Sequence, residues 1–166
     1  MEIKVVGGDM TKLEVDAIVN ASDEEMSGGG GVDLAIYRAA GPELLEECKK
    51  LGGCKTGETK ITKGYNLPAK YVIHTVGPVY GQENGNEEKL LAGCYKNCLQ
   101  LAKENNIKTI AFPAISTGAY GYPKNEAAKI ALAAVKEFCA VNSDSFDQII
   151  FVCFDNENYE IYKKLC

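Results

Sequence analysis

Strand-like and helix-like segments alternate along this chain of 166 residues, and that alternation constrains the fold more than any other feature. Residues 148–154, QIIFVCF, are apolar throughout after the initial Gln148, which is typical of a strand buried on both faces of a sheet. Strands that alternate with helices predict a mostly parallel sheet with helices on both faces. We therefore expect an α/β fold, and the length fits a single domain over residues 1–166.

The pattern also predicts where each element lies. Strands are expected at residues 2–8, 15–22, 108–115 and 148–154, with two more around a turn within 58–78. Helices are expected at residues 32–50, 87–105, 123–140 and 157–166, the third opened by Pro123. Because such sheets bind ligands at the carboxyl ends of their strands, four polar segments should share one rim: GGDMT, NASDEEMSGGGGVD, STGAYGYP and FDNEN.

Composition excludes several classes of protein. The net charge is −5 and the Lys and Arg residues form no cluster, which disfavours a polynucleotide as partner. No apolar run is long enough to cross a membrane, and the start does not resemble a signal peptide, so a cytoplasmic protein is expected. The seven cysteines are odd in number and lie mostly in apolar runs, which indicates packed thiols without disulfides or a metal site.

Two glycine-containing loops are candidates for binding an anion. Gly28 to Gly31 precede a predicted helix, and Ser116 to Gly121 join a strand to another helix. Backbone N–H groups in such loops and at helix starts can bind phosphate, so two of them on one rim could hold a diphosphate. The alternative is that each loop serves only its turn.

Three side chains in these regions have two interpretations each. Asp33 either favours the helix dipole or orients a water beside a bound anion. Asp9 either caps a turn or accepts a hydrogen bond from an exocyclic amine. Phe154 is either a core aromatic or a ring that stacks on a base. His74, the only histidine, alternates with valines along a strand and is interpreted as a structural core group.

Four stretches, GDMTKLEVDAIVNAS, GGGGVD with RAAGP, TGETKITKGYNLPAKYVIHTVGP and AFPAISTGAYGYP, resemble the MacroD-type branch of the macrodomain family. The resemblance implies a three-layer α/β/α sandwich with a mixed, mostly parallel central sheet. It also implies binding of ADP-ribose and hydrolysis of mono-ADP-ribose esters on aspartate and glutamate of modified proteins, and of O-acetyl-ADP-ribose. No metal or cofactor is expected, and neither polynucleotide nor membrane is an expected partner.

The same resemblance assigns roles to individual residues. Asp33 holds the attacking water, and Asn20 and Asp23 belong to the catalytic stretch. Ligand contacts fall on Asp9 and Met10 for adenine, Phe154 for stacking, and Tyr122 for the distal ribose. The two phosphates are assigned to Gly29, Gly30, Gly31 and Val32, and to Ser116, Thr117, Gly118, Ala119 and Tyr120.

Several positions depart from the family pattern. The family has N-A-A-N where this chain has Asn20-Ala21-Ser22-Asp23, and Leu34 and Tyr37 replace a common Gly and His. An ionised carboxylate only accepts hydrogen bonds, whereas an amide also donates. Three functions therefore stay open: a hydrolase, a reader that binds ADP-ribose without turnover, and a phosphatase acting on ADP-ribose 1″-phosphate.

Overall fold

A six-stranded sheet forms the centre of the computed structural model, which describes residues 1–166. The strands are β1 (Glu2–Gly7), β2 (Ala17–Ala21), β3 (Thr59–Lys63), β4 (Tyr71–Thr75), β5 (Thr109–Phe112) and β6 (Gln148–Cys153). Their order across the sheet is β1-β6-β5-β2-β4-β3, and every neighbouring pair is parallel except β3 with β4. The predicted mixed, mostly parallel sheet is confirmed.

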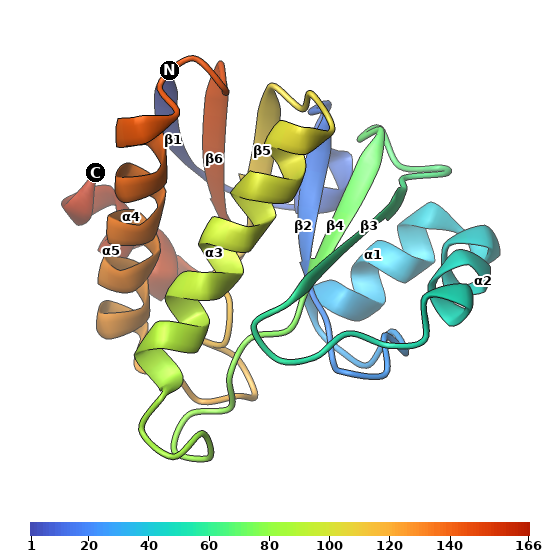
Figure 1. Ribbon diagram of the computed structural model, residues 1–166, viewed down its shortest axis with the longest axis horizontal. Coiled ribbons are helices and arrows are strands. Elements are labelled where there is room, and N and C mark those ends of the chain that lie inside the picture. Colours follow the sequence, from blue (N-terminus) through green and yellow to red (C-terminus); the bar gives the residue numbers. More distant parts are fainter.

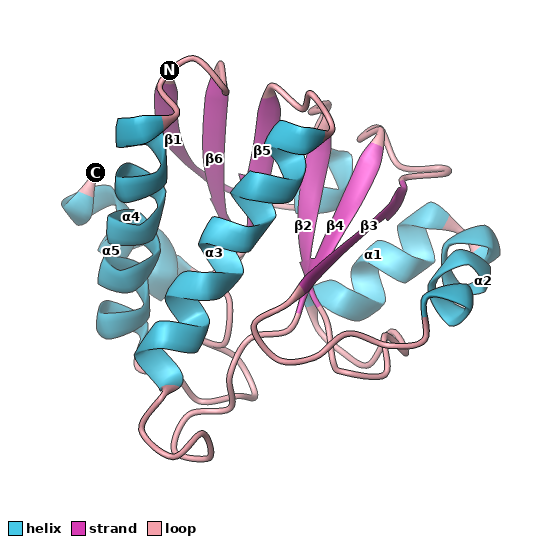
Figure 2. Ribbon diagram, in the orientation of Figure 1, coloured by secondary structure: helices cyan, strands magenta, loops and turns pink.

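Helices cover both faces of this sheet, so the predicted three-layer sandwich is also confirmed (Figures 1 and 2). They are η1 (Met10–Lys12), α1 (Val32–Ala40), α2 (Pro42–Leu51), α3 (Glu87–Glu104), α4 (Lys124–Val141) and α5 (Asn156–Leu165). One buried cluster joins α3, α4 and α5 to the sheet, and a second joins η1, α1 and α2 to its other face. None of the helices is long and apolar enough to cross a bilayer.

The prediction of a single helix over residues 32–50 is wrong, because the chain forms two helices there. Gly41 separates α1 from α2 with a φ of 91°, a conformation that favours glycine, and Pro42 then opens α2. The apolar spacing continues across the break, which is why periodicity alone missed it. The strand expected over 108–115 is also shorter, since Pro113 follows β5 directly and cannot donate to a neighbouring strand.

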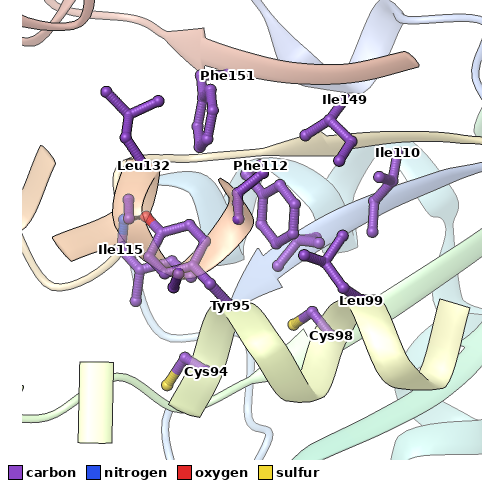
Figure 3. Packing of buried hydrophobic residues seen from close by; sticks show 14 of the residues in the cluster. Cys94, Tyr95, Cys98, Leu99, Ile110, Phe112, Ile115, Leu132, Ile149 and Phe151 are labelled. Atoms are coloured by element: carbon purple, nitrogen blue, oxygen red, sulfur yellow. Dashed lines mark hydrogen bonds between the residues drawn. The ribbon is translucent and has the colours of Figure 1, made fainter. Parts of the chain in front are cut away.

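Aromatic packing in the cluster that joins α3, α4 and α5 to the sheet fixes the end of β5 (Figure 3). The rings of Tyr95 and Phe112 are 5.1 Å apart between centroids, and Phe112 stacks on Phe151 at 6.0 Å. The Tyr95 hydroxyl donates to Pro113 O and accepts from Ile115 N, both at 3.3 Å. The core therefore holds the first residues of the loop that follows β5.

The cysteines are packed as the sequence indicated. All seven are free thiols, and six of them are buried, with Cys166 the exposed exception. Burial raises the pKa of Cys94 and of Cys153 to about 11, so both thiols stay protonated at neutral pH. These side chains behave as small apolar groups of the core.

Candidate active site

The carboxyl ends of five parallel strands meet at one rim of the sheet, the lower edge in Figure 1. Loops from β1, β2, β4, β5 and β6 all contribute residues to the cavities there. The central strand β5 lies between β6 and β2, where the strand order reverses, and that is where open α/β sheets bind ligands. The predicted gathering of four polar segments on one rim is therefore found.

Two adjoining cavities occupy this rim. The larger, of about 600 Å³, is bordered by the loops after β2, β5 and β6, and the smaller, of about 360 Å³, by the loop after β1 and the start of α1. They share four lining residues: Gly31, Val32, Pro113 and Phe154. Together they form an elongated site within the size range of small-molecule pockets.

Backbone N–H groups without partners lie on two loops of the larger cavity. Gly30 and Gly31 precede α1, and their N–H groups donate to no atom of the protein. On the second loop the N–H groups of Gly118, Ala119 and Tyr120 are likewise unpartnered. Unpaired amides beside a helix start favour an anion, so two such sets suit a ligand with two linked anionic groups.

Ser116 lines the larger cavity. Its side chain is buried, its φ is 67°, and its Oγ has no hydrogen-bond partner. A β-carbon at Gly77 would collide with that Oγ, so the loop after β4 can pass beneath the serine only as glycine. An unsatisfied buried hydroxyl in a cavity wall marks a place where a polar ligand gains a hydrogen bond.

Asp33 is the most constrained carboxylate of the site. It is 4% exposed, in the first turn of α1, and its Oδ1 accepts from Asn20 Nδ2 at 2.8 Å. Its Oδ2 accepts from Gly29 N, also at 2.8 Å. Burial raises the pKa of Asp33 and the charge of Asp23 adds to the rise, while the two hydrogen bonds oppose it. A buried, fixed carboxylate with a raised pKa is suited to accept a proton near neutral pH.

Asp23 lies on the same cavity wall, ten residues before Asp33 in the chain. Its Oδ1 accepts from Ser27 N at 3.0 Å and its Oδ2 from Ser27 Oγ at 2.6 Å. The carboxylate therefore also braces the loop that carries the glycines. It adds a second acidic group beside Asp33 without supplying any donor to the cavity.

The charged lining is mostly acidic. Asp23, Asp33 and Asp155 line the larger cavity, and Lys124 is its one cationic side chain. Lys124 Nζ is 3.7 Å from Asp155 Oδ1 and 3.0 Å from Glu157 Oε2, so its charge is already paired. Attraction for an anion must therefore come from the backbone N–H groups.

An exposed ring and a carboxylate mark the smaller cavity. Phe154 is 76% exposed and borders both cavities, which excludes the interpretation of this ring as a core aromatic. Asp9 accepts hydrogen bonds from the amide and the hydroxyl of Thr11, at 2.9 and 2.6 Å, so it caps the turn as one of its two interpretations predicted. These bonds lower the pKa of Asp9, whose carboxylate stays charged and exposed beside Met10.

Most of the predicted residues meet at these cavities, and two do not line them. Tyr122 is 4% exposed and packs edge-on against Tyr80 with ring centroids 4.9 Å apart, so the structure places it in the core. Asn20 is fully buried behind Asp33 and supports that carboxylate. Lining residues that the sequence reasoning did not single out include Gly77, Pro113, Ala114 and Lys124, whereas Asp155 belongs to the FDNEN segment that was expected on this rim.

His74 is fully buried, as the sequence predicted, yet it is not isolated from the site. Asn20 and His74 are register partners on the neighbouring strands β2 and β4. Asn20 Nδ2 lies 3.2 Å from His74 Nδ1, and His74 Nε2 lies 2.9 Å from Thr62 Oγ1. Burial lowers the pKa of His74 to about 4, so the ring is neutral in the folded protein.

This neutral ring predicts a loss of stability in mild acid. An unfolded histidine titrates near pH 6.5 and the folded one near 4, so between these values the unfolded chain binds more protons. Stability then rises with pH through that window, and the loss from pH 7 to pH 5 is about 2 kcal/mol. Urea unfolding at both pH values should show this loss in the wild type and a smaller one in His74→Asn. An equal loss in both would exclude His74 as its source.

The family model for the Macro domain matches residues 19–131. The chain is 58% identical to ADP-ribose glycohydrolase MACROD2 from Xenopus laevis, over 95% of this chain and 38% of that protein. It is 56% identical to a Macro domain-containing protein from Chlorobaculum tepidum, over 98% of this chain and 94% of that protein.

A solved structure shows the same architecture. The Trypanosoma brucei macrodomain in complex with ADP-ribose superposes with a TM-score of 0.93 and 46% identity, over 98% of this chain and 68% of that one. The chain thus spans nearly all of the bacterial relative but less than half of the MACROD2 protein.

Proposed function

This chain belongs to the macrodomain family, and on that premise we propose that it binds ADP-ribose and hydrolyses mono-ADP-ribose esters on aspartate and glutamate side chains. O-acetyl-ADP-ribose, which carries the same kind of ester, is the proposed second substrate. The names of the MACROD2 relative and of the Trypanosoma brucei complex support this assignment. The observation that carries it is a buried carboxylate, Asp33, at a cavity with two sets of unpartnered amides.

The diphosphate is proposed to lie between the two loops of the larger cavity. Gly29, Gly30, Gly31 and Val32 contact one phosphate, and Ser116, Thr117, Gly118, Ala119 and Tyr120 the other. The amides are neutral donors, so they stabilise the phosphates despite the acidic lining. This explains how a chain with net charge −5 can bind a dianion without an arginine or lysine at the phosphates.

Adenosine is proposed to occupy the smaller cavity. Phe154 stacks on the adenine ring, and Asp9 accepts from its exocyclic amine while Met10 offers its backbone N–H. The shared border of the two cavities lets one elongated ligand cross from adenine to phosphate. The distal ribose then lies near Asp23 and Asp33.

In the proposed reaction Asp33 and a phosphate oxygen hold a water molecule. The water oxygen bonds to the anomeric carbon of the distal ribose, the bond to the carboxyl oxygen of the modified side chain breaks, and that side chain leaves as a carboxylate. Asp33 accepts the proton of the water, which its raised pKa favours. With O-acetyl-ADP-ribose the same water attacks the carbonyl carbon of the ester, the bond from that carbon to the ribose oxygen breaks, and the ribose oxygen takes up the proton that Asp33 accepted, which releases acetic acid and ADP-ribose. Fixed positions of water and charge lower the barrier.

The decisive experiment is incubation with a protein mono-ADP-ribosylated on glutamate. Loss of label from the protein together with release of free ADP-ribose is the expected result. ADP-ribose 1″-phosphate should release no inorganic phosphate, which separates hydrolysis of the ester from phosphatase activity. Label retained on the protein after many hours would refute the hydrolase assignment.

Adenine recognition gives a prediction for binding. Asp9→Ala should weaken ADP-ribose binding about fivefold, or roughly 1 kcal/mol, the usual net contribution of one hydrogen bond at an exposed site. Asp9→Asn keeps an acceptor and should bind within about twofold of wild type. Titration calorimetry of the three proteins measures the difference. Wild-type affinity in Asp9→Ala would show that this carboxylate does not contact the ligand.

A reader without turnover is the second candidate, and Asp23 is the observation that favours it. This carboxylate lines the cavity beside Asp33, both its oxygens accept from Ser27, and it offers the ribose no donor. Binding residues are the same in both candidates. ADP-ribose affinity without loss of label would therefore select the reader.

A further inference from the structure

A chain of four buried polar side chains runs from the candidate active site into the sheet. We call Asp33, Asn20, His74 and Thr62 the relay. Asn20 Nδ2 donates to Asp33 Oδ1 at 2.8 Å and lies 3.2 Å from His74 Nδ1, and His74 Nε2 lies 2.9 Å from Thr62 Oγ1. Each member is less than 5% exposed, so water does not compete for these bonds.

The hydrogen-bond directions in the relay follow from donor chemistry. The Asn20 amide nitrogen has two hydrogens, one for Asp33 and one for His74 Nδ1. His74 Nδ1 must therefore accept, and its ring proton is on Nε2, from which it donates to Thr62 Oγ1. A charged histidine could not accept at Nδ1, so the relay requires the neutral ring.

Nothing else holds the Asn20 amide in this orientation. Its Oδ1 is buried and has no hydrogen-bond partner. Reversing the amide would place Oδ1 against the ionised Asp33, which is unfavourable because both groups only accept. A protonated Asp33 could donate to that oxygen, however, so the reversed amide becomes competitive once Asp33 has taken a proton. With the ring proton on Nε2, His74 Nδ1 needs a donor and so opposes the reversal, which would require the ring proton to move to Nδ1 and the Thr62 hydroxyl to donate to Nε2.

We propose that His74 is a positioning residue for the hydrolysis. It keeps the Asn20 N–H turned toward Asp33, so that Asp33 returns readily to the ionised form that orients water. The inference rests on the proposed function, and it adds a residue on β4 that does not touch the ligand.

Other titratable groups around the relay are few. The Tyr37 ring of α1 lies 6.4 Å from the His74 ring, and Cys48 Sγ of α2 lies 3.8 Å from His74 Nε2. Burial raises the pKa of both side chains, so both are neutral. Asp23, in the loop after β2, is the charged group that acts on Asp33. A change in the pKa of Asp33 after substitution of His74 would therefore arise from the hydrogen bonds of the relay.

The test compares His74→Leu, which removes the acceptor, with His74→Asn, whose amide oxygen can accept close to the position of Nδ1. Carbon-13 NMR of the carboxyl groups gives the pKa of Asp33 without ligand, and steady-state kinetics gives kcat and KM. In His74→Leu we expect the pKa of Asp33 to rise by about one unit, because the Asn20 bond weakens. At a pH below the pKa of Asp33, where a rise of one unit lowers the ionised fraction about tenfold, we expect kcat to fall about tenfold with KM within about twofold. His74→Asn should restore the pKa of Asp33 and kcat to values close to those of the wild type.

Two further variants keep the test decisive. Thr62→Val replaces a hydroxyl by a methyl group, so the ring proton of His74 is free to move to Nδ1. The pKa of Asp33 should then rise, by less than in His74→Leu. This variant tests the inference even if His74→Leu does not fold. Val72→Ala, on the same strand and fully buried, should lower stability and leave the pKa of Asp33 and kcat unchanged.

An unchanged pKa of Asp33 in His74→Leu and Thr62→Val would overturn the inference. So would a fall in kcat no larger than that of Val72→Ala. A wild-type protein that hydrolyses nothing would overturn the proposed function instead, because the titration of Asp33 requires no turnover.

Discussion

Asp33→Ala should lower the rate of ester hydrolysis by about 10²–10⁴-fold, the usual effect of removing a positioned acid–base group. ADP-ribose affinity should stay within a few-fold of wild type or improve, because a buried negative charge near the diphosphate is removed. Single-turnover kinetics with a glutamate-linked substrate and calorimetry with ADP-ribose measure the two effects separately. Equal turnover in the variant would exclude Asp33 as the group that orients water.

The matched control is Glu25→Ala, which removes an exposed carboxylate from the loop between β2 and α1, outside the cavity. It makes the same change in net charge and should leave the rate unchanged. The pH dependence gives a further check, since burial raises the pKa of Asp33. The wild-type rate should fall as the pH is lowered through that raised pKa, because the ionised form accepts the proton from water.

Asp23→Asn should raise turnover at pH 7 by one to two powers of ten, or roughly 1.4–2.8 kcal/mol in the barrier. The new amide keeps an oxygen for Ser27 N, and its nitrogen can donate both to Ser27 Oγ and into the cavity. It also removes the charge that opposes ionisation of Asp33. De-ADP-ribosylation rates at pH 5, 6, 7 and 8 measure the gain.

Ser27→Ala is the control for this substitution, because it releases one oxygen of Asp23 and leaves its charge in place. If the charge limits turnover, the serine variant should not reproduce the gain. A slower Asp23→Asn at every pH would show instead that the carboxylate takes part in the reaction. The chain would then be a distinct catalytic variant of its family.

Local patterns predicted most of the fold. The apolar run at 148–154 became β6 (Gln148–Cys153), and the turn within 58–78 separates the antiparallel β3 and β4. The break at Gly41 was missed because the apolar spacing continues through it, while the positive φ that ends α1 is a backbone property. Glycine loops between strand and helix located the cavity correctly.

Contacts between segments that are distant in the sequence could not be predicted from local patterns. The pairing of Asn20 with His74 depends on the register of β2 against β4, which no single-segment pattern specifies. Lys124 reaches the cavity because α4 begins at the same rim. Tyr122 follows a predicted binding loop, but the edge-on contact with Tyr80 places it in the core.

The acidic lining has a consequence for selectivity. Because neutral amides attract the ligand while Asp23 and Asp33 repel it, and Lys124 is paired with Asp155 and Glu157, each extra negative charge on a ligand adds repulsion without adding a free cationic partner. Nucleoside triphosphates and polynucleotides are thus disfavoured relative to a diphosphate whose ends are both sugars. Affinity for ADP-ribose should also vary little with ionic strength, unlike that of proteins which bind phosphates through lysine and arginine. We therefore expect nucleotides that carry more negative charge than ADP-ribose to compete only weakly with it for this cavity.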